Sequence, residues 1–151
     1  MKKFIIVITI FLLIAYFTAL VVPVDPDEQR AGTRLSGDFA ENQDQDWADW
    51  QGRRKLYLQT RTLYLIPHSI TVVGWIRNGG LYVGCGHCVT KYWPKNVEQD
   101  NSVIMRIDGE LYRRLAFKLS DEERRVALDL DEAEPLPDVA VFRMQTLYKQ
   151  M

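Results

Sequence analysis

Cysteine and histidine are scarce in this chain of 151 residues, which contains two of each. Two cysteines are too few to hold together a disulfide-rich scaffold. The formal net charge of -1 lacks the basic excess of nucleic-acid-binding domains, so we expect no nucleic-acid partner. With 47% hydrophobic and 26% charged residues, the composition is that of one ordinary globular domain.

The chain has a single long hydrophobic run, which argues against a polytopic membrane protein. Phe4 to Val22 carry no charge, and the run is long enough to cross a bilayer as a helix. It exceeds a signal-peptide core and lacks a good small-residue cleavage site, so we favour an uncleaved transmembrane anchor over residues 1–22. Lys2 and Lys3 precede the run and acids follow it, which predicts a cytoplasmic N-terminus. We therefore expect a single-pass protein of the inner (cytoplasmic) membrane, with its C-terminal domain in the oxidising periplasm or another extracytoplasmic space.

Charge is segregated along the chain despite the small net value. Residues 51–120 carry eleven bases against four acids, whereas residues 23–50 carry eight acids and two arginines. Residues 121–138 are again acidic. A basic middle between acidic flanks indicates either that the middle holds an anion such as a phosphate, or that the blocks neutralise one another in the fold.

Composition divides the rest of the chain into a polar connection and a folded domain. Residues 23–45 are acidic and turn-rich, so we expect a tether there, followed by the domain over residues 46–151. We expect Asp46–Trp50 to begin a short helix that packs two tryptophans onto the domain. Alternation and β-branched or aromatic enrichment then predict strands at Lys55–Leu65, Ser69–Arg77, Leu81–Cys85, Val103–Ile107, Glu110–Leu119 and Val139–Leu147.

Turn and cap signals define how these strands connect. Asn78-Gly79-Gly80 predicts a tight hairpin turn. Pro94 suits the first turn of a short helix, and a Ser-x-x-Glu capping box at Ser120 predicts a helix over Asp121–Leu130. The resulting order, β-β-β-α-β-β-α-β, lacks the alternation of a parallel sheet. The sequence therefore predicts a mainly β (α+β) fold, namely a six-stranded antiparallel barrel with short helices, plus the N-terminal transmembrane helix.

Cys85-Gly86-His87-Cys88 is the most distinctive local motif. CGHC is also the active-site tetrapeptide of protein disulfide isomerases, in which a low-pKa thiol attacks disulfides. The surrounding hairpins lack the βαβ frame of such a site, so an inert structural pair is the alternative to a redox pair of Cys85 and Cys88. A metal site that adds His68 and His87 is a third interpretation, for which a single CxxC is weak evidence.

A second set of motifs extends from Pro67 to Leu128. A strand that begins at Pro67 ends in the Gly-rich turn, and the short strand Leu81-Tyr82-Val83-Gly84 follows. Lys95-Asn96-Val97 then precedes Asp100-Asn101 and Val103. In these motifs the chain resembles the split-barrel flavin-binding superfamily, which includes pyridoxamine-phosphate-oxidase-like and deazaflavin-dependent nitroreductase-like proteins.

The resemblance implies a split barrel that binds FMN or deazaflavin, and a homodimer with the cofactor at its interface. Backbone N–H groups and basic side chains near a helix start attract a phosphate. By position, the implied phosphate contacts are Gly84, Cys85, Thr90, Lys91, Lys95 and Asn96. The ring system of the family's cofactor lies against the second and third strands, which implicates Val73, Trp75 and Tyr82.

Three functional classes stay open at this point. The leading hypothesis is a membrane-anchored, flavin- or deazaflavin-dependent oxidoreductase acting on a small molecule, in which the cofactor supplies the chemistry and no side chain is identifiable as an acid or base. The second is a thiol-disulfide oxidoreductase that uses the CGHC pair. The third is a non-catalytic binding or assembly module. Cys85 stands where the family has Ser or Thr, so haem with His68 or His87 as ligand, or no cofactor, are alternatives.

Overall fold

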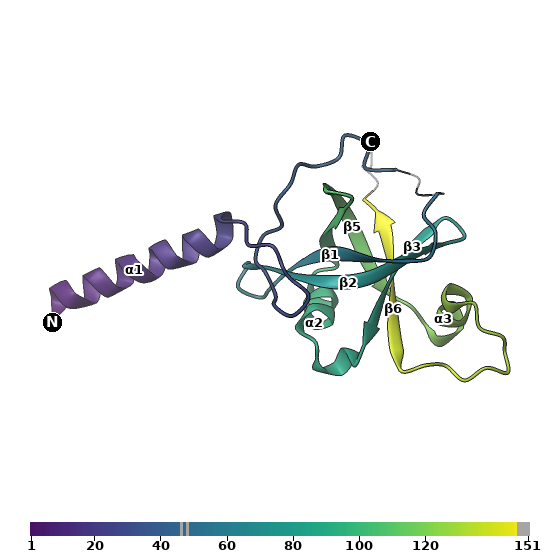
Figure 1. Ribbon diagram of the computed structural model, residues 1–151. Helices are drawn as coiled ribbons and strands as arrows, with labels where there is room; N and C mark the ends of the chain where they lie inside the picture. Colours follow the sequence, from purple (N-terminus) through teal and green to yellow (C-terminus); the bar gives the residue numbers. More distant parts are fainter. Residues whose placement is uncertain (46, 48, 148–151) are drawn as a thin grey trace.

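The computed structural model describes residues 1–45, 47 and 49–147. Its first element is α1 (Lys2–Val21), a helix that projects away from the rest of the chain (Figure 1). Its 20 residues rise about 30 Å, which matches the hydrocarbon core of a bilayer. The most apolar stretch of α1 is not buried against the domain. By length and composition, α1 is suited to span a membrane. The predicted apolar helix is present, and its orientation in a membrane stays a prediction.

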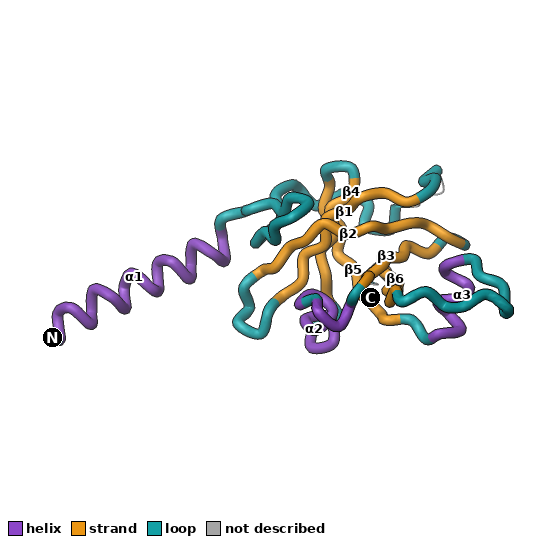
Figure 2. The backbone as a smooth tube through the Cα atoms, turned by 60° about the horizontal axis from the view of Figure 1, so that its bottom comes forward, coloured by secondary structure: helices purple, strands orange, loops and turns teal. Residues whose placement is uncertain are grey.

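Six antiparallel strands close into a barrel in the order β1-β2-β3-β6-β5-β4, with β4 pairing back onto β1 (Figure 2). This closure confirms the predicted six-stranded antiparallel barrel. The strands are β1 (Arg53–Arg61), β2 (Pro67–Arg77), β3 (Gly80–Gly86), β4 (Ser102–Ile107), β5 (Glu110–Lys118) and β6 (Val139–Thr146).

The barrel forms because its strands alternate between inward and outward side chains. In β4, Val103, Met105 and Ile107 are buried, while the residues between them are partly exposed. The β2–β3 turn places Asn78 and Gly79 at positive φ angles of 48° and 73°, as a type I′ hairpin turn requires. The local pattern and the turn chemistry therefore agree with the closed sheet.

Short helices occupy the two predicted positions between strands. The 3₁₀ turn η1 (Cys88–Thr90) leads into α2 (Tyr92–Gln99) after β3, and α3 (Asp121–Leu128) follows β5. The capping box at Ser120 is formed in both directions, as predicted. The helix ends two residues earlier than expected because Asp129 adopts a left-handed conformation, with φ of 62°.

The first strand also ends earlier than the predicted Leu65. Thr62 to Ile66 form a hydrogen-bonded turn, in which the N–H of Leu65 donates to the carbonyl of Thr62 at 2.9 Å. Leu65 has a positive φ of 63°, which an extended strand does not allow. The apolar residues of this segment misled the strand prediction, because they continue the composition of the strand into a turn.

Residues 23–45, expected as a tether, lie along the barrel and are called the strap below (Figure 1). Backbone hydrogen bonds join Gly32 to Ser69 of β2 in both directions, with N–O distances of 2.8 and 3.1 Å. Farther along, Phe39 pairs with Leu111 of β5, and the Leu35 side chain is buried. The acidic composition conceals this packing, because it depends on a few apolar and glycine residues rather than on a periodic pattern.

Two residues of the segment expected as a short helix, 46 and 48, lie outside the described residues, so that helix stays a prediction. The two tryptophans of the segment do pack onto the barrel. The ring of Trp47 lies 6.3 Å from that of Trp50 and 5.2 Å from that of Tyr112 in β5, in edge-to-face arrangements. The guanidinium of the buried Arg114 lies 5.1 Å from the Trp47 ring, which adds a cation–π contact.

Candidate functional site

A cleft of about 870 Å³ is lined by the strap, by residues of β1, β2 and β3, and by the start of α2. Its volume lies in the upper part of the range of about 300–1,000 Å³ that is typical of small-molecule sites. The strap contributes residues 27–31, β2 contributes His68 and residues 70–73 with Trp75, and the end of β3 contributes residues 84–86. Thr90 at the end of η1 and Lys91 before the first residue of α2 also line the cleft.

The sequence-predicted cofactor residues divide into two groups. Those that line the cleft are Val73, Trp75, Gly84, Cys85, Thr90 and Lys91. Tyr82, Lys95 and Asn96 lie outside its lining. The structure therefore brings the residues of β2, β3 and the η1 turn together and directs the later residues of α2 elsewhere.

Each residue outside the cleft has another partner. The Asn96 amide donates to the Thr60 hydroxyl of β1 at 2.9 Å, which fastens α2 to the barrel. The ammonium of Lys95 lies 5.9 Å from the centre of the Tyr92 ring. Tyr82 stacks on Trp75 with a ring separation of 6.1 Å. These contacts explain the packing of the three side chains without any ligand.

The cleft contains more positive than negative charge. Four cationic side chains line it, Arg30, Arg53, Lys55 and Lys91, against the acidic Asp27 and Glu28. Lys55 pairs with Glu28. Among the described residues, the other three cations have no carboxylate within 4.0 Å. The site is thus suited to an anionic ligand.

The strap wall of the cleft is held in a defined conformation. A carboxylate oxygen of Asp27 accepts hydrogen bonds from the backbone N–H groups of Gln29 and Arg30, at 2.8 and 2.6 Å. The hydroxyl of Thr71 in β2 donates to the carbonyl of Asp27 at 3.0 Å. This Asx-type turn fixes the backbone that carries Arg30, a lining residue of the cleft. Sequence reasoning missed Arg30, and Asp27 followed by Gly32 in an otherwise featureless segment was the available signal.

Arg53 and Lys55 of β1 were also missed as site residues. The Arg53 guanidinium lies 5.4 Å from the centre of the Trp75 ring. Arg53, which was not predicted as a site residue, therefore contacts Trp75, which was. Both cations belong to the basic block of the chain. This basic block indicated an anion site. The residue pattern of β1 did not predict which of its cationic side chains would line the cleft.

The two histidines have different environments. His68 lines the cleft, and burial lowers its pKa below the ordinary 6.5, so the ring is neutral at pH 7. His87 lies on the exposed loop between β3 and η1 with a left-handed φ of 50°. Within the described part of the chain, no three His, Cys, Asp or Glu side chains come close enough together to hold a metal ion.

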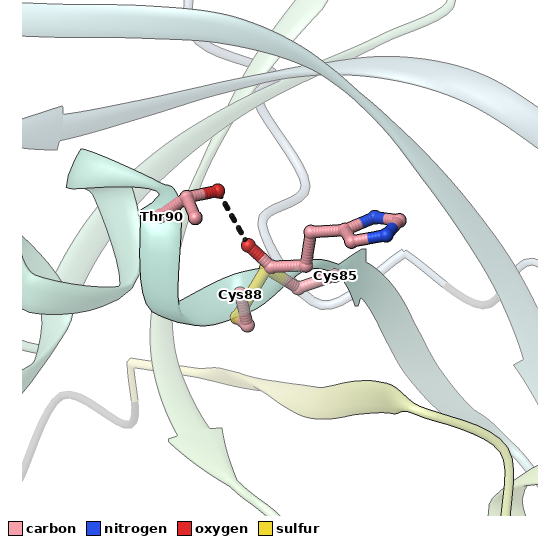
Figure 3. The surroundings of a disulfide bond; sticks show 4 residues. Cys85, Cys88 and Thr90 are labelled. Carbon is pink, nitrogen blue, oxygen red and sulfur yellow. Dashed lines mark hydrogen bonds between the residues drawn. A yellow bond between two sulfur atoms is a disulfide. The ribbon is translucent and has the colours of Figure 1, made fainter.

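Cys85, which lines the cleft, forms a disulfide with Cys88 (Figure 3). Their Cα atoms lie 5.3 Å apart. Cys85 is buried at the end of β3, whereas Cys88 begins η1 and is half-buried. The Thr90 hydroxyl donates to the His87 carbonyl at 2.8 Å and closes the loop that joins the two cysteines. Neither thiol is free to act as a metal ligand in this state.

No family model matches the chain. No curated protein matches it either.

Several solved structures show a distant similarity to the chain. One is a protein of unknown function from Agrobacterium tumefaciens, with 18% identity and a TM-score of 0.47, covering 62% of this chain and 48% of that one. A candidate 5-nitroimidazole antibiotic resistance protein from Bacteroides thetaiotaomicron has 14% identity and a TM-score of 0.45, over 63% and 84% of the two chains. A candidate pyridoxamine 5′-phosphate oxidase from Listeria innocua has 16% identity and a TM-score of 0.43, over 60% and 81%.

The closed barrel itself decides the fold. The chain folds as a closed six-stranded antiparallel barrel. This is the architecture that the motifs from Pro67 to Leu128 predict, and it rests on the strand order rather than on these distant similarities. The chain spans about half the length of the Agrobacterium protein.

Proposed function

We propose that the barrel binds flavin mononucleotide in the cleft and acts as a membrane-anchored oxidoreductase on a small molecule. The observation that carries this proposal is the convergence of Arg30, Arg53 and Lys91 on a cleft that also contains the indole of Trp75. A phosphate requires cationic partners, and a flat ring system requires apolar or aromatic walls. Both requirements are met within one cavity of sufficient size.

The residues present fit the two ends of such a ligand. Lys91 and Arg30 would hold the phosphate through their side chains, because the N–H groups of Thr90 and Lys91 already donate to the carbonyls of His87 and Cys88. Val73 and Trp75 of β2 would contact the ring. Gly86 also faces the cleft, and a Cβ atom at this position would meet no other atom within 4 Å, so the backbone there is accessible to a ligand. When bound, the flavin would supply the hydride or electron transfer, and the protein would bind and orient it.

The N-terminal helix supports a proposal about the cellular location of this activity. We propose that α1 anchors the chain in the cytoplasmic membrane, with Lys2 and Lys3 inside and the barrel outside. Homodimerisation through the cofactor face is a further proposal that comes from the resemblance. Crosslinking of the full-length protein in detergent, with and without FMN, tests it.

Comparing FMN with riboflavin tests the phosphate contacts directly. The full-length protein in detergent is titrated with each ligand, and quenching of flavin fluorescence is followed. Lys91→Ala is compared with Lys95→Ala, because both remove a lysine from the same region but only Lys91 lines the cleft. We expect Lys91→Ala to weaken FMN binding about tenfold or more, as loss of a charge-assisted hydrogen bond does.

The riboflavin arm separates the role of the phosphate from a general loss of folding. Lys91→Ala is expected to leave riboflavin binding unchanged, and Lys95→Ala is expected to leave both affinities unchanged. Equal weakening of both ligands by Lys91→Ala would contradict the phosphate assignment. A wild-type protein that binds none of FMN, deazaflavin and haem would overturn the cofactor proposal. It would favour thiol-disulfide exchange or a non-catalytic binding module.

The disulfide favours a second candidate function, thiol-disulfide exchange at the same cleft. Cys88 is the more accessible sulfur, so an incoming thiolate would attack Cys88 and release Cys85 as the leaving thiolate. A second substrate thiol then resolves the mixed disulfide, so that the substrate dithiol is oxidised and the protein pair is reduced. This order is the reverse of a thioredoxin-type site, where the first cysteine of the motif is the exposed nucleophile.

Equilibration with glutathione redox buffers tests this candidate. Thiol labelling of the full-length protein gives the fraction of oxidised pair, and Cys85→Ser and Cys88→Ser serve as variants. A catalytic pair is expected to have a reduction potential near those of known exchange proteins, and Cys88→Ser is expected to abolish oxidation of a dithiol substrate. A potential below about -300 mV with no activity would instead identify a structural disulfide.

A further inference from the structure

The turn between β1 and β2 exposes three consecutive apolar side chains. Leu63, Tyr64 and Leu65, called the apolar tip below, are 73%, 73% and 60% exposed. The turn is closed by hydrogen bonds from the N–H of Leu65 to the Thr62 carbonyl and from the N–H of Thr62 to the Ile66 carbonyl. These side chains are therefore exposed by a defined backbone conformation, and their exposure calls for a partner.

The apolar tip lies beside the membrane-type helix. Figures 1 and 2 both show the β1–β2 turn on the side of the barrel nearest α1. The hydroxyl of Tyr16 in α1 donates to the carbonyl of Tyr64 at 3.0 Å. Tyr16 lies five residues before the end of α1, which corresponds to about 7.5 Å along the helix axis. The tip thus reaches back past the end of α1, to the level of residues that we expect within the bilayer.

We propose that the apolar tip inserts into the bilayer surface next to α1, so that the barrel is held at two points rather than by α1 alone. This inference rests on the proposed anchoring by α1. Leu63 and Leu65 would enter the acyl-chain boundary, and the Tyr64 ring would lie at the headgroup level, as apolar and aromatic residues of interfacial segments do. The Tyr16 hydroxyl, which otherwise lacks water at that depth, keeps the Tyr64 carbonyl as its acceptor.

Charges near the membrane surface are compatible with this orientation. Asp25, which closely follows α1, pairs with Arg106 at 2.8 Å. Glu28 pairs with Lys55. These acids are therefore partly neutralised by cations of the barrel, which reduces their repulsion from anionic headgroups. Arg61, at the base of the tip, has a side chain that is 60% exposed and lies 3.9 Å from the Asp100 carboxylate, so a paired charge rather than a lone acid faces the membrane there.

Lipid-dependent quenching at three positions tests the proposal. Single cysteines are introduced as Leu63→Cys, Asn78→Cys and Phe11→Cys in the full-length chain, whose own two cysteines are joined in a disulfide. Each is labelled with an environment-sensitive NBD probe, and the protein is reconstituted into phosphatidylcholine–phosphatidylglycerol vesicles with or without doxyl-labelled lipid. Asn78 is the matched control, because it lies in the β2–β3 turn at the opposite end of β2. Phe11 reports on α1 itself.

The expected result is strong quenching at Phe11, severalfold stronger quenching at Leu63 than at Asn78, and a blue-shifted emission at Leu63. Quenching at Phe11 with a probe at Leu63 that behaves like the one at Asn78 would overturn the insertion of the tip while leaving the anchor intact. A blue shift at Leu63 without lipid quenching would overturn it in favour of a protein contact, such as a second copy of the chain. Absence of quenching at Phe11 would refute the anchor and, with it, this inference.

Discussion

Replacing Gly32 by alanine is expected to loosen the strap and lower the stability of the barrel. A Cβ atom at Gly32 would lie 2.0 Å from the Val24 carbonyl oxygen, 2.6 Å from the Ser69 hydroxyl and 2.7 Å from the Pro26 nitrogen. Two of these atoms belong to the backbone, so a side-chain rotation cannot relieve the clash. The strap must move, and the paired hydrogen bonds between Gly32 and Ser69 are the contacts that it loses first.

The size of the effect follows from those contacts. Each backbone hydrogen bond contributes about 1 kcal/mol net to stability, so the loss of two costs about 2 kcal/mol. If the strap is released far enough to expose Leu35, which is 2% exposed in the native structure, about 1.5–3 kcal/mol is added. For the strap and barrel together, 1 kcal/mol corresponds to about 4 °C in Tm, so a fall of about 8 °C or more is expected.

Thermal unfolding of the full-length protein in detergent, followed by near-UV circular dichroism, measures the change. Gly86→Ala is the matched control, because a Cβ atom at Gly86 meets nothing within 4 Å, and its Tm is expected to stay within about 3 °C of the wild-type value. Hydrogen exchange at the Ser69 amide is expected to accelerate in Gly32→Ala only. A Gly32→Ala protein that melts together with Gly86→Ala, with Ser69 still protected, would refute the close contact between strap and barrel.

Three further predictions concern the strap, the cleft and the capped helix. Burial alone would raise the pKa of Asp25, but hydrogen bonds from Ser36 and the nearby Arg106 guanidinium hold this pKa below its ordinary 3.8. The carboxylate therefore stabilises the fold at neutral pH, and this stabilisation is lost as pH falls below about 4. The Tm difference between wild type and Asp25→Asn should accordingly shrink on acidification, and a constant difference would contradict the assignment. Trp75→Phe removes a buried hydrogen bond of 2.9 Å from the indole N–H to the carbonyl at the end of α3, and urea unfolding should show a loss of about 1–3 kcal/mol. Ser120→Ala removes the N-cap of α3 and should cost about 1 kcal/mol, whereas Ser120→Asp should retain most of the stability.

Local patterns in the sequence determined the elements of this protein. The uncharged run from Phe4 predicted α1, because a helix of that length and composition needs no other part of the chain to be recognised. The alternating strands, the Asn78-Gly79 turn and the capping box at Ser120 predicted the succession of strands and helices along the chain, because these signals act within a few residues. Local composition also placed the predicted end of β1 too late, at Leu65. Leu63–Leu65 continue the apolar composition of the strand, but they form a turn.

Only the tertiary structure decided which of these residues meet at the cleft. Arg30 belongs to the strap and Arg53 belongs to β1. Both segments pack against β2, and these contacts join residues that are far apart in the sequence. Lys95 and Asn96 match the expected motif, yet they face Tyr92 and β1, because the packing of α2 sets their direction. The sequence specifies charge and periodicity within short segments, whereas the position of one segment on another depends on close packing between residues that are distant along the chain.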